Sequence, residues 1–286
     1  MSTPVAEDGR VQVEGGSIWY RLVGENDGHP VVTLHGGPGY PSASLQPLEA
    51  LASDGQVVFY DQLGCGNSDR PDDPSLWTVK RYVDELERLL RHLDLAEVHL
   101  LGHSWGTMLA VDFYMAHPQS VRSMVLVSPA LSASRWKQDC ERLISQLPPD
   151  LRAIHADPDA SKDDIDRLKS EFMSRHFLRL KHEPESHKRA MEGFGEQVYL
   201  TMWGPNEFTP TGVLEDYERV DDLSDIEVPV LLLCGRYDEA TPESTHLYTS
   251  LLPNAEMKVF ENSAHNAFLE DADEFITTVR RFLAST

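Results

Sequence analysis

Apolar residues follow two alternating patterns along the 286-residue chain. The first is a short continuous run, rich in Val and Leu, that stops at a glycine or a polar residue. Such runs are typical of strands buried on both faces of a sheet. Near the N-terminus, two runs around Gly15-Gly16 predict a β-hairpin over residues 11–24. Further strands are predicted within residues 31–39, 56–64, 98–104, 121–130, 228–238 and 255–265.

The second pattern is a recurrence of apolar residues at steps of three and four, which predicts amphipathic helices. The clearest example covers residues 78–93. Another helix is predicted over 105–117, before Pro118, and a third near the C-terminus around Phe275 and Phe282. The alternation of strands and helices predicts an α/β fold with a doubly wound, mainly parallel sheet.

Residues 131–222 interrupt this alternation. The stretch is richer in charge, has helical periodicity and carries no strong strand signal. We therefore predict an α/β core formed by residues 1–130 and 223–286, with 131–222 as an inserted helical cap. Such an insertion would lie over the carboxyl ends of the strands, where open α/β sheets bind their ligands.

The charge and the cysteines narrow the expected partners and location. The chain has 47 acidic and 25 basic residues, a formal charge of −22. This excess repels nucleic acid and anionic membrane surfaces, so neither is expected as a partner. No apolar run approaches the roughly 20 residues of a membrane helix, and the first residues do not resemble a secretory signal. Three cysteines without regular spacing favour a cytoplasmic location over a disulfide framework.

The sharpest chemical motif is Gly102-His103-Ser104-Trp105-Gly106, which fits G-x-S-x-G. It lies between a predicted strand and a predicted helix, as a nucleophile elbow does. In that turn the serine hydroxyl is exposed at the N-terminus of a helix, and the positions two before and two after the serine must be small. The motif predicts a serine hydrolase of the α/β-hydrolase fold with Ser104 as its nucleophile.

A serine nucleophile needs a base, and in this fold the order along the chain is serine, acid, histidine. Asp238 ends one predicted strand and His265 follows the next, so both lie at strand carboxyl ends, as Ser104 does. We predict His265 as the general base and Asp238 as the residue that orients it. His103 is interpreted as a packing residue, and Asp61, which precedes the nucleophile, is given a structural role.

Stabilising the oxyanion of a tetrahedral intermediate requires two backbone N–H groups. One is expected from Trp105, directly after the nucleophile. The other is expected from the glycine-rich loop His35–Gly39, in which we favour Gly37. Glycines allow this loop to approach a substrate carbonyl closely.

Taken together, HGGPG, DQLGCGNSDRP, GHSWG, MWGPNEFTPTG and GRYDEATPES resemble the proline iminopeptidases (prolyl aminopeptidases) of the α/β-hydrolase superfamily. The resemblance runs from about residue 10 to the C-terminal helix, and FMSRHFLR at 172–179 resembles the cap of that family. It implies the same triad and oxyanion donors as those predicted above. One departure is Leu63 in DQLGCG, where many members have arginine.

The resemblance also implies how the free amino group of a substrate is bound. Family members use acidic residues for it, and these correspond here to Glu207 in GPNEF and to Glu239 beside Asp238. Such a pair is chemically reasonable because a buried ammonium group requires a partnered charge. Without the resemblance, a solvated glutamate on the cap is the alternative interpretation of Glu207.

The predicted function is a serine aminopeptidase that releases an N-terminal proline or another small apolar residue from short peptides through an acyl-enzyme on Ser104. An amino acid amidase, or an esterase or lactonase of the same fold without a free-amine requirement, is the alternative. A non-catalytic binding protein on a hydrolase frame is disfavoured by the complete catalytic set. No cofactor or metal ion is expected, and the sequence leaves the oligomeric state and the preferred N-terminal residue open.

Overall fold

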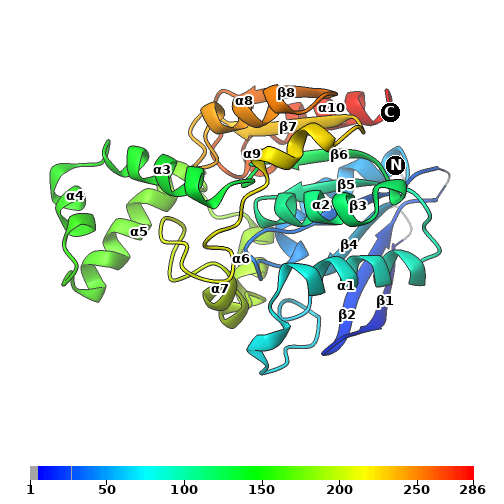
Figure 1. Cartoon of the computed structure of the whole chain (residues 1–286), viewed down its shortest axis with the longest axis horizontal. Helices are drawn as coiled ribbons and strands as arrows, with labels where there is room; N and C mark the ends of the chain where they lie inside the picture. The colour runs from blue at the N-terminus through cyan, green and yellow to red at the C-terminus, as the bar shows by residue number, and fades with distance from the viewer. Residues whose placement is uncertain (1–5, 27) are drawn as a thin grey trace.

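The computed structural model describes residues 6–26 and 28–286, which form one eight-stranded sheet with helices on both faces (Figure 1). The strand order is β1-β2-β4-β3-β5-β6-β7-β8. The pairs β1–β2 and β2–β4 are antiparallel, and all pairs from β4 to β8 are parallel. This confirms the predicted α/β fold. The strands are β1 (Ala6–Val13), β2 (Gly16–Val23), β3 (Val31–Leu34), β4 (Val57–Asp61), β5 (Val98–His103), β6 (Val121–Val127), β7 (Val230–Gly235) and β8 (Ala255–Phe260).

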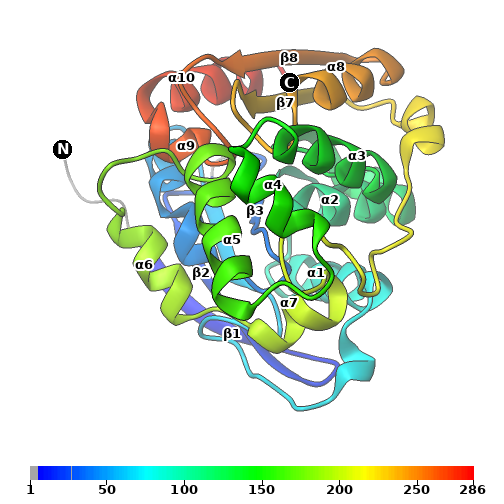
Figure 2. The ribbon, with the colours of Figure 1, turned by 90° about the vertical axis from the view of Figure 1, so that its left-hand side faces the viewer.

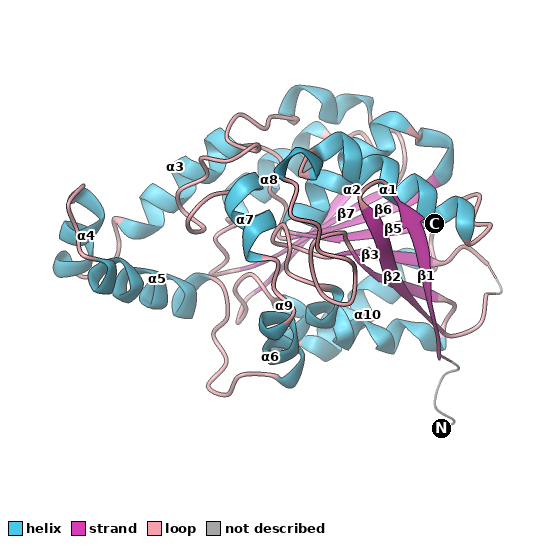
Figure 3. Ribbon diagram, turned by 90° about the horizontal axis from the view of Figure 1, so that it is seen from below, coloured by secondary structure: helices cyan, strands magenta, loops and turns pink. Residues whose placement is uncertain are grey.

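Neighbouring residues of the central strands face two separate apolar layers. Val32 and Leu100 belong to one layer, whereas Val31 and Leu101 belong to the other. Since helices cover both faces of the sheet, every position of β3, β4, β5 and β7 is buried, which explains their continuous apolar runs (Figure 3). The first layer includes α1 (Val79–His92), α2 (Trp105–Ala116) and α8 (Pro242–Leu251), and the second includes the 3₁₀ helix η1 (Ser42–Ser53), α9 (Ala267–Glu270) and α10 (Ala272–Leu283).

The structure departs from the sequence predictions at several element ends. The hairpin turn is Glu14-Gly15 rather than Gly15-Gly16. The parallel strands stop earlier than predicted, and the residues after them form loops at one edge of the sheet. The sequence patterns also do not predict η1 or α8. In η1 the buried Leu45, Leu48 and Leu51 are spaced by three, the repeat of a 3₁₀ helix rather than of an α-helix.

The chain between β6 and β7 is helical and lies beyond the carboxyl ends of the parallel strands. In Figure 1 it projects away from the C-terminus, and Figure 2 looks onto it in front of the sheet. An isolated antiparallel bridge between Ser132 and Glu218 joins the two ends of this insertion, so the chain leaves and re-enters the core at one place. The helices are α3 (Ala133–Ile144), α4 (Pro149–Ala156), α5 (Lys162–His176), α6 (Glu185–Glu192) and α7 (Glu196–Met202).

The first turn of α2 lies very close to the sheet. A Cβ atom on Gly106 would lie 2.0 Å from the carbonyl oxygen of Leu34 in β3, and one on Gly102 would lie 2.3 Å from the carbonyl oxygen of Gly106. Backbone atoms cannot move aside as a flexible side chain can. Glycine is therefore required at both ends of the G-x-S-x-G turn.

Replacing Gly106 by alanine is expected to lower the free energy of unfolding by at least about 2 kcal/mol, because α2 must move off β3. Urea denaturation of the purified variant measures this loss. Gly28→Ala is the matched control, because a Cβ atom at Gly28 meets nothing within 4 Å. Equal stability of the two variants would contradict the close packing of α2 on β3.

Candidate active site

A cavity of about 830 Å³ lies between the carboxyl ends of the central strands and the inserted helices. The core contributes Gly37, Ser104 and His265 to its wall, and the insertion contributes Phe177, Phe194 and Glu207. Residues from both parts of the chain therefore face one cavity, at the edge of the sheet where a ligand of an open α/β fold is expected.

Ser104 occupies a strained turn between β5 and α2. Its backbone has φ 54° and ψ −120°, a combination that residues other than glycine rarely adopt. The turn is held by hydrogen bonds on both sides: Ser104 N donates to Val127 O over 2.9 Å, and Thr107 N donates to Ser104 O over 2.8 Å. The hydroxyl is thus presented to the cavity at the N-terminus of α2, as the motif predicts for a nucleophile.

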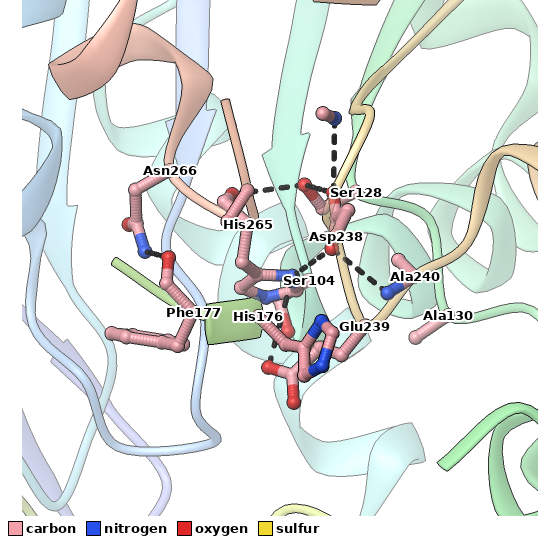
Figure 4. A network of polar contacts seen from close by, with 12 residues as sticks. Ser104, Ser128, Ala130, His176, Phe177, Asp238, Glu239, Ala240, His265 and Asn266 are labelled. Carbon is pink, nitrogen blue, oxygen red and sulfur yellow. Dashed lines mark hydrogen bonds and ion pairs between the residues drawn. The ribbon is translucent and has the colours of Figure 1, made fainter. Parts of the chain in front are cut away.

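Asp238 and His265 come together from the loops after β7 and β8 (Figure 4). Nδ1 of His265 lies 2.7 Å from Oδ1 of Asp238. The carboxylate also accepts hydrogen bonds from Ala240 N over 2.8 Å and from the Ser128 hydroxyl over 2.6 Å. Since a carboxylate only accepts, Nδ1 carries the proton of a neutral His265 and Nε2 is left free to act as a base. The structure brings the predicted acid and base into contact.

Two further residues hold the backbone of His265. The Ser128 hydroxyl lies 2.9 Å from His265 O, and Nε2 of His103 lies 3.0 Å from the same oxygen. Ser128 is fully buried and has φ 52°, so its backbone is strained like that of Ser104. Sequence reasoning missed Ser128, because nothing around it marks a strained turn. It interpreted His103 as a packing residue, whereas the structure shows that His103 also fixes the loop of His265.

Burial keeps His103 neutral. Its pKa lies well below the usual value, first because the ring is buried and second because it lies beside His265. The two ring centroids are 4.8 Å apart. A neutral His103 donates from Nε2 to the carbonyl of His265 without adding a second positive charge next to the base.

The glycine-rich loop lies close to the nucleophile. A Cβ atom on Gly36 would lie 3.2 Å from the Cβ of Ser104. Gly37 has φ +107°, and a side chain there would lie 2.6 Å from the backbone nitrogens of Gly39 and Tyr40. The indole of Trp105 is buried, where its Nε1 donates to Gln62 over 2.8 Å. Any contribution of Trp105 to the cavity therefore comes from its backbone N–H.

Glu207 and Glu239 lie near the base in different settings. Glu207 lines the cavity, and its Oε1 accepts a hydrogen bond from the Tyr199 hydroxyl over 2.8 Å. Glu239 is fully buried, 3.8 Å from Nδ1 of His265, and neither of its carboxylate oxygens has a hydrogen-bond partner among residues 6–26 and 28–286. It therefore lies behind the cavity surface rather than on it.

Burial raises the pKa of both glutamates. For Glu239 the negative charges of Glu207 and Asp238 raise the pKa further, to well above its usual value. For Glu207 the hydrogen bond from Tyr199 and the positive charge of a protonated His265 oppose the effect of burial. Two neighbouring buried carboxylates of this kind attract a proton or another cation.

Leu63 and Asp61 lie outside the cavity wall. The fully buried Leu63 side chain packs near Gly15 and Gly16 in the turn of the N-terminal hairpin. Asp61 accepts hydrogen bonds from Ser42 N over 2.9 Å and from Asn67 N over 2.8 Å, which agrees with the structural role given to it. The departure from the family motif at Leu63 therefore affects packing near the hairpin and not the wall of the cavity.

Three general features of the chain bear on cofactors and location. Within the described part of the chain, no group of three or more His, Cys, Asp or Glu side chains is arranged to hold a metal ion. No helix among these residues is long and apolar enough to cross a membrane. Cys65, Cys140 and Cys234 are buried and free.

Comparison with known proteins identifies the family. A family profile described as the alpha/beta hydrolase fold matches residues 29–272. The proline iminopeptidase of Heyndrickxia coagulans is 42% identical over 284 residues, covering 97% of this chain and 99% of that protein. The crystal structure of the proline iminopeptidase of Mycobacterium smegmatis matches with a TM-score of 0.91 at 31% identity, over 98% of both chains. That of VinJ matches with a TM-score of 0.92 at 34% identity, also over 98% of both chains.

These relatives match the chain over nearly its whole length, and they share its sheet and its insertion at a TM-score above 0.9. Three of the motifs that resemble proline iminopeptidases, HGGPG, GHSWG and MWGPNEFTPTG, contribute residues to the cavity wall. The chain therefore belongs to the proline iminopeptidase family of the α/β hydrolases.

Proposed function

We propose that this protein is a serine aminopeptidase that releases an N-terminal proline, or another small apolar residue, from short peptides. The observation that carries the proposal is the pair formed by Glu207 on the cavity wall and the fully buried Glu239 near His265. Neither glutamate pairs with a lysine or arginine among the described residues. A cavity lined by a serine nucleophile and one carboxylate, with a second carboxylate buried behind its wall and no cation beside either, is suited to a substrate that brings its own positive charge.

A free α-amino group supplies that charge. Its ammonium form would donate a hydrogen bond to Glu207, and its positive charge would offset the cost of burying Glu239 behind the cavity surface. A substrate with a blocked amine would leave these carboxylates without a partner and would be rejected for that reason. This requirement separates an aminopeptidase from an esterase or lactonase of the same fold.

The proposed reaction begins with acylation of Ser104. As Oγ attacks the scissile carbonyl carbon, Nε2 of His265 accepts the hydroxyl proton, and Asp238 stabilises the imidazolium that forms. The backbone N–H groups of Gly37 and Trp105 are the proposed donors to the oxyanion. When the C–N bond breaks, His265 returns the proton to the leaving amine.

Deacylation follows the same path with water as the nucleophile. His265 accepts a proton from the water molecule, the water oxygen attacks the ester carbonyl, and the second tetrahedral intermediate collapses to release the amino acid. His265 then returns its proton to Oγ of Ser104. The atoms balance without a metal ion or an organic cofactor.

We also propose the domain boundaries and the location predicted from the sequence. The bridge between Ser132 and Glu218 supports a cap of residues 131–222 on a core of 1–130 and 223–286. The cap closes the cavity on one side, which favours short peptides as substrates. Three free buried cysteines support the reducing environment of the cytoplasm.

A panel of aminoacyl 4-nitroanilides, their N-acetylated forms and 4-nitrophenyl acetate tests the proposed specificity. Free-amine compounds are expected to be cleaved, with proline the best, whereas the acetylated compounds remain uncleaved because they cannot pair with the two carboxylates. Cleavage of the ester alone would keep the triad and reject the aminopeptidase.

Glu207→Gln is expected to reduce kcat/KM for prolyl 4-nitroanilide by about 100-fold, on the order of 2.7 kcal/mol, and to leave kcat/KM for the ester within a few-fold. The carboxamide keeps the size of the side chain but removes its charge. Glu183→Gln is the matched control, because Glu183 lines the same cavity but is exposed and pairs with His187. Equal loss on both substrates would reject the binding role of Glu207.

Glu239→Gln is expected to stabilise the substrate-free protein at neutral pH by about 1–3 kcal/mol, while impairing cleavage of free-amine substrates. The folded-state pKa of Glu239 is raised above its ordinary value of 4.5, so its favourable contribution is fully present below that pH and is lost as pH rises through the folded pKa. The gain from the substitution should therefore shrink towards zero at acidic pH. Melting temperatures measured from about pH 4 to pH 8 test this, and a gain that does not depend on pH would contradict it.

A further inference from the structure

A short stretch of the insertion, residues 176–179, contacts both loops that carry the predicted acid and base. It lies where α5 ends and the chain turns towards α6. On the acid side, Nδ1 of His176 donates to Tyr237 O over 2.8 Å, and Glu239 N donates to His176 O over 3.3 Å. These two hydrogen bonds therefore hold the residues directly before and directly after Asp238.

On the base side, the same segment is tied to both neighbours of His265. Nδ2 of Asn266 donates to Phe177 O over 2.8 Å, as Figure 4 shows. Arg179 N donates to Oε1 of Glu270, and Oε2 of Glu270 accepts from Ala264 N over 2.6 Å. Segment 176–179 is thus held by the side chain of Asn266, which directly follows His265. It is also held by the carboxylate of Glu270, which binds Ala264, the residue directly before His265.

The ring of Phe177 adds a direct contact with the base. Its centroid lies 5.4 Å from that of the His265 imidazole, with an angle of 28° between the ring planes. A stacked ring limits rotation of the imidazole and shields one of its faces from water. Asp238 fixes the position of Nδ1, and Phe177 fixes the plane of the ring on the cap side.

The pattern of hydrogen bonds distinguishes two roles for this segment. Phe177 and Leu178 line the substrate cavity, but a segment that only formed a wall would need no bonds to the catalytic loops. Four hydrogen bonds connect residues 176–179 to residues adjacent to the acid and the base, or to the carboxylate that holds one of them. Together these bonds tie the segment to both catalytic loops.

We propose that segment 176–179 positions His265, so that docking of the cap and alignment of the base are one event. Asn266 and Phe177 are the positioning residues that carry this coupling. The inference rests on the proposed roles of Ser104 and His265. It adds the requirement that the cap contact the loop of His265, which the G-x-S-x-G motif does not specify. A displaced cap would leave the triad residues present but His265 out of line with Ser104.

The test uses a fluorophosphonate probe, which labels an activated serine and carries no amino group. The rate of labelling therefore reports on the serine and its base without involving the amine site. In Asn266→Leu, which keeps the bulk of the side chain but cannot donate to Phe177 O, labelling is expected to slow by about tenfold or more. The kcat values for prolyl 4-nitroanilide and 4-nitrophenyl acetate should fall by the same factor, with KM nearly unchanged.

A pair of substitutions at Phe177 provides an independent measurement if Asn266→Leu does not fold. Phe177→Leu removes the ring that stacks on His265 and is expected to slow labelling, whereas Phe177→Tyr keeps the ring and should restore most of the rate. Glu171→Gln is the control on the same helix, because its carboxylate pairs with Arg175 and does not line the cavity. That variant should label like the wild type.

The outcomes separate this inference from the proposed function. Unchanged labelling in Asn266→Leu and Phe177→Leu, with a raised KM for the anilide alone, would make segment 176–179 a substrate wall and overturn the inference while the proposed function stands. Failure of the wild-type chain to label at Ser104, with Ser104→Ala as the blank, would overturn both. Parallel loss of labelling and of kcat on both substrates supports the inference.

Discussion

Ser104 is held in a backbone conformation with φ 54° that costs on the order of 1–3 kcal/mol, and the rest of the site depends on keeping it there. The strain persists because α2 packs directly against the sheet. The contact is so close that a side chain at position 106 would collide with Leu34 O. This contact places the hydroxyl at the edge where β7 and β8 also end. The loops after those strands then need only a few residues to bring Asp238 and His265 to it.

Strongly acidic chains usually carry their charge on the surface, and most of the excess of 22 negative charges here serves solubility. Glu207 and Glu239 are different because one lines the cavity, the other is fully buried, and neither pairs with a lysine or arginine among the described residues. Burial raises the pKa of both, and the negative charges of Glu207 and Asp238 raise the pKa of Glu239 further. Carboxylates without a cation are unfavourable in the empty protein, and an ammonium group bound beside them would compensate their negative charge. Under the proposed function, affinity for a free amine would arise from relief of this unfavourable state as well as from direct contact with Glu207.

The sequence was sufficient to predict the parallel sheet and the meeting of Asp238 with His265 at its edge, because buried strands and the fixed order of serine, acid and histidine leave strong patterns. It was insufficient where the structure depends on contacts between distant segments. The helix η1 was missed because its three-residue spacing fits neither a strand nor an α-helix. Ser128 has φ 52° without a glycine to signal it, and the hydrogen bond of Asn266 to Phe177 joins residues 89 positions apart. The two glutamates were found only through the family resemblance, since no spacing rule connects Glu207 with Glu239.

Asp238 and Glu239 show how one loop gives neighbouring carboxylates different chemistry. The oxygens of Asp238 accept hydrogen bonds from Ser128, from Ala240 N and from Nδ1 of His265, so its charge is satisfied and its orientation is fixed. Within residues 6–26 and 28–286, the oxygens of Glu239 accept none. A satisfied carboxylate can orient a histidine through every step of a reaction but has no capacity left for a ligand. An unsatisfied one beside it cannot orient anything, but it can bind a cation that arrives with the substrate. The division of roles follows from the hydrogen bonds and not from the residue types.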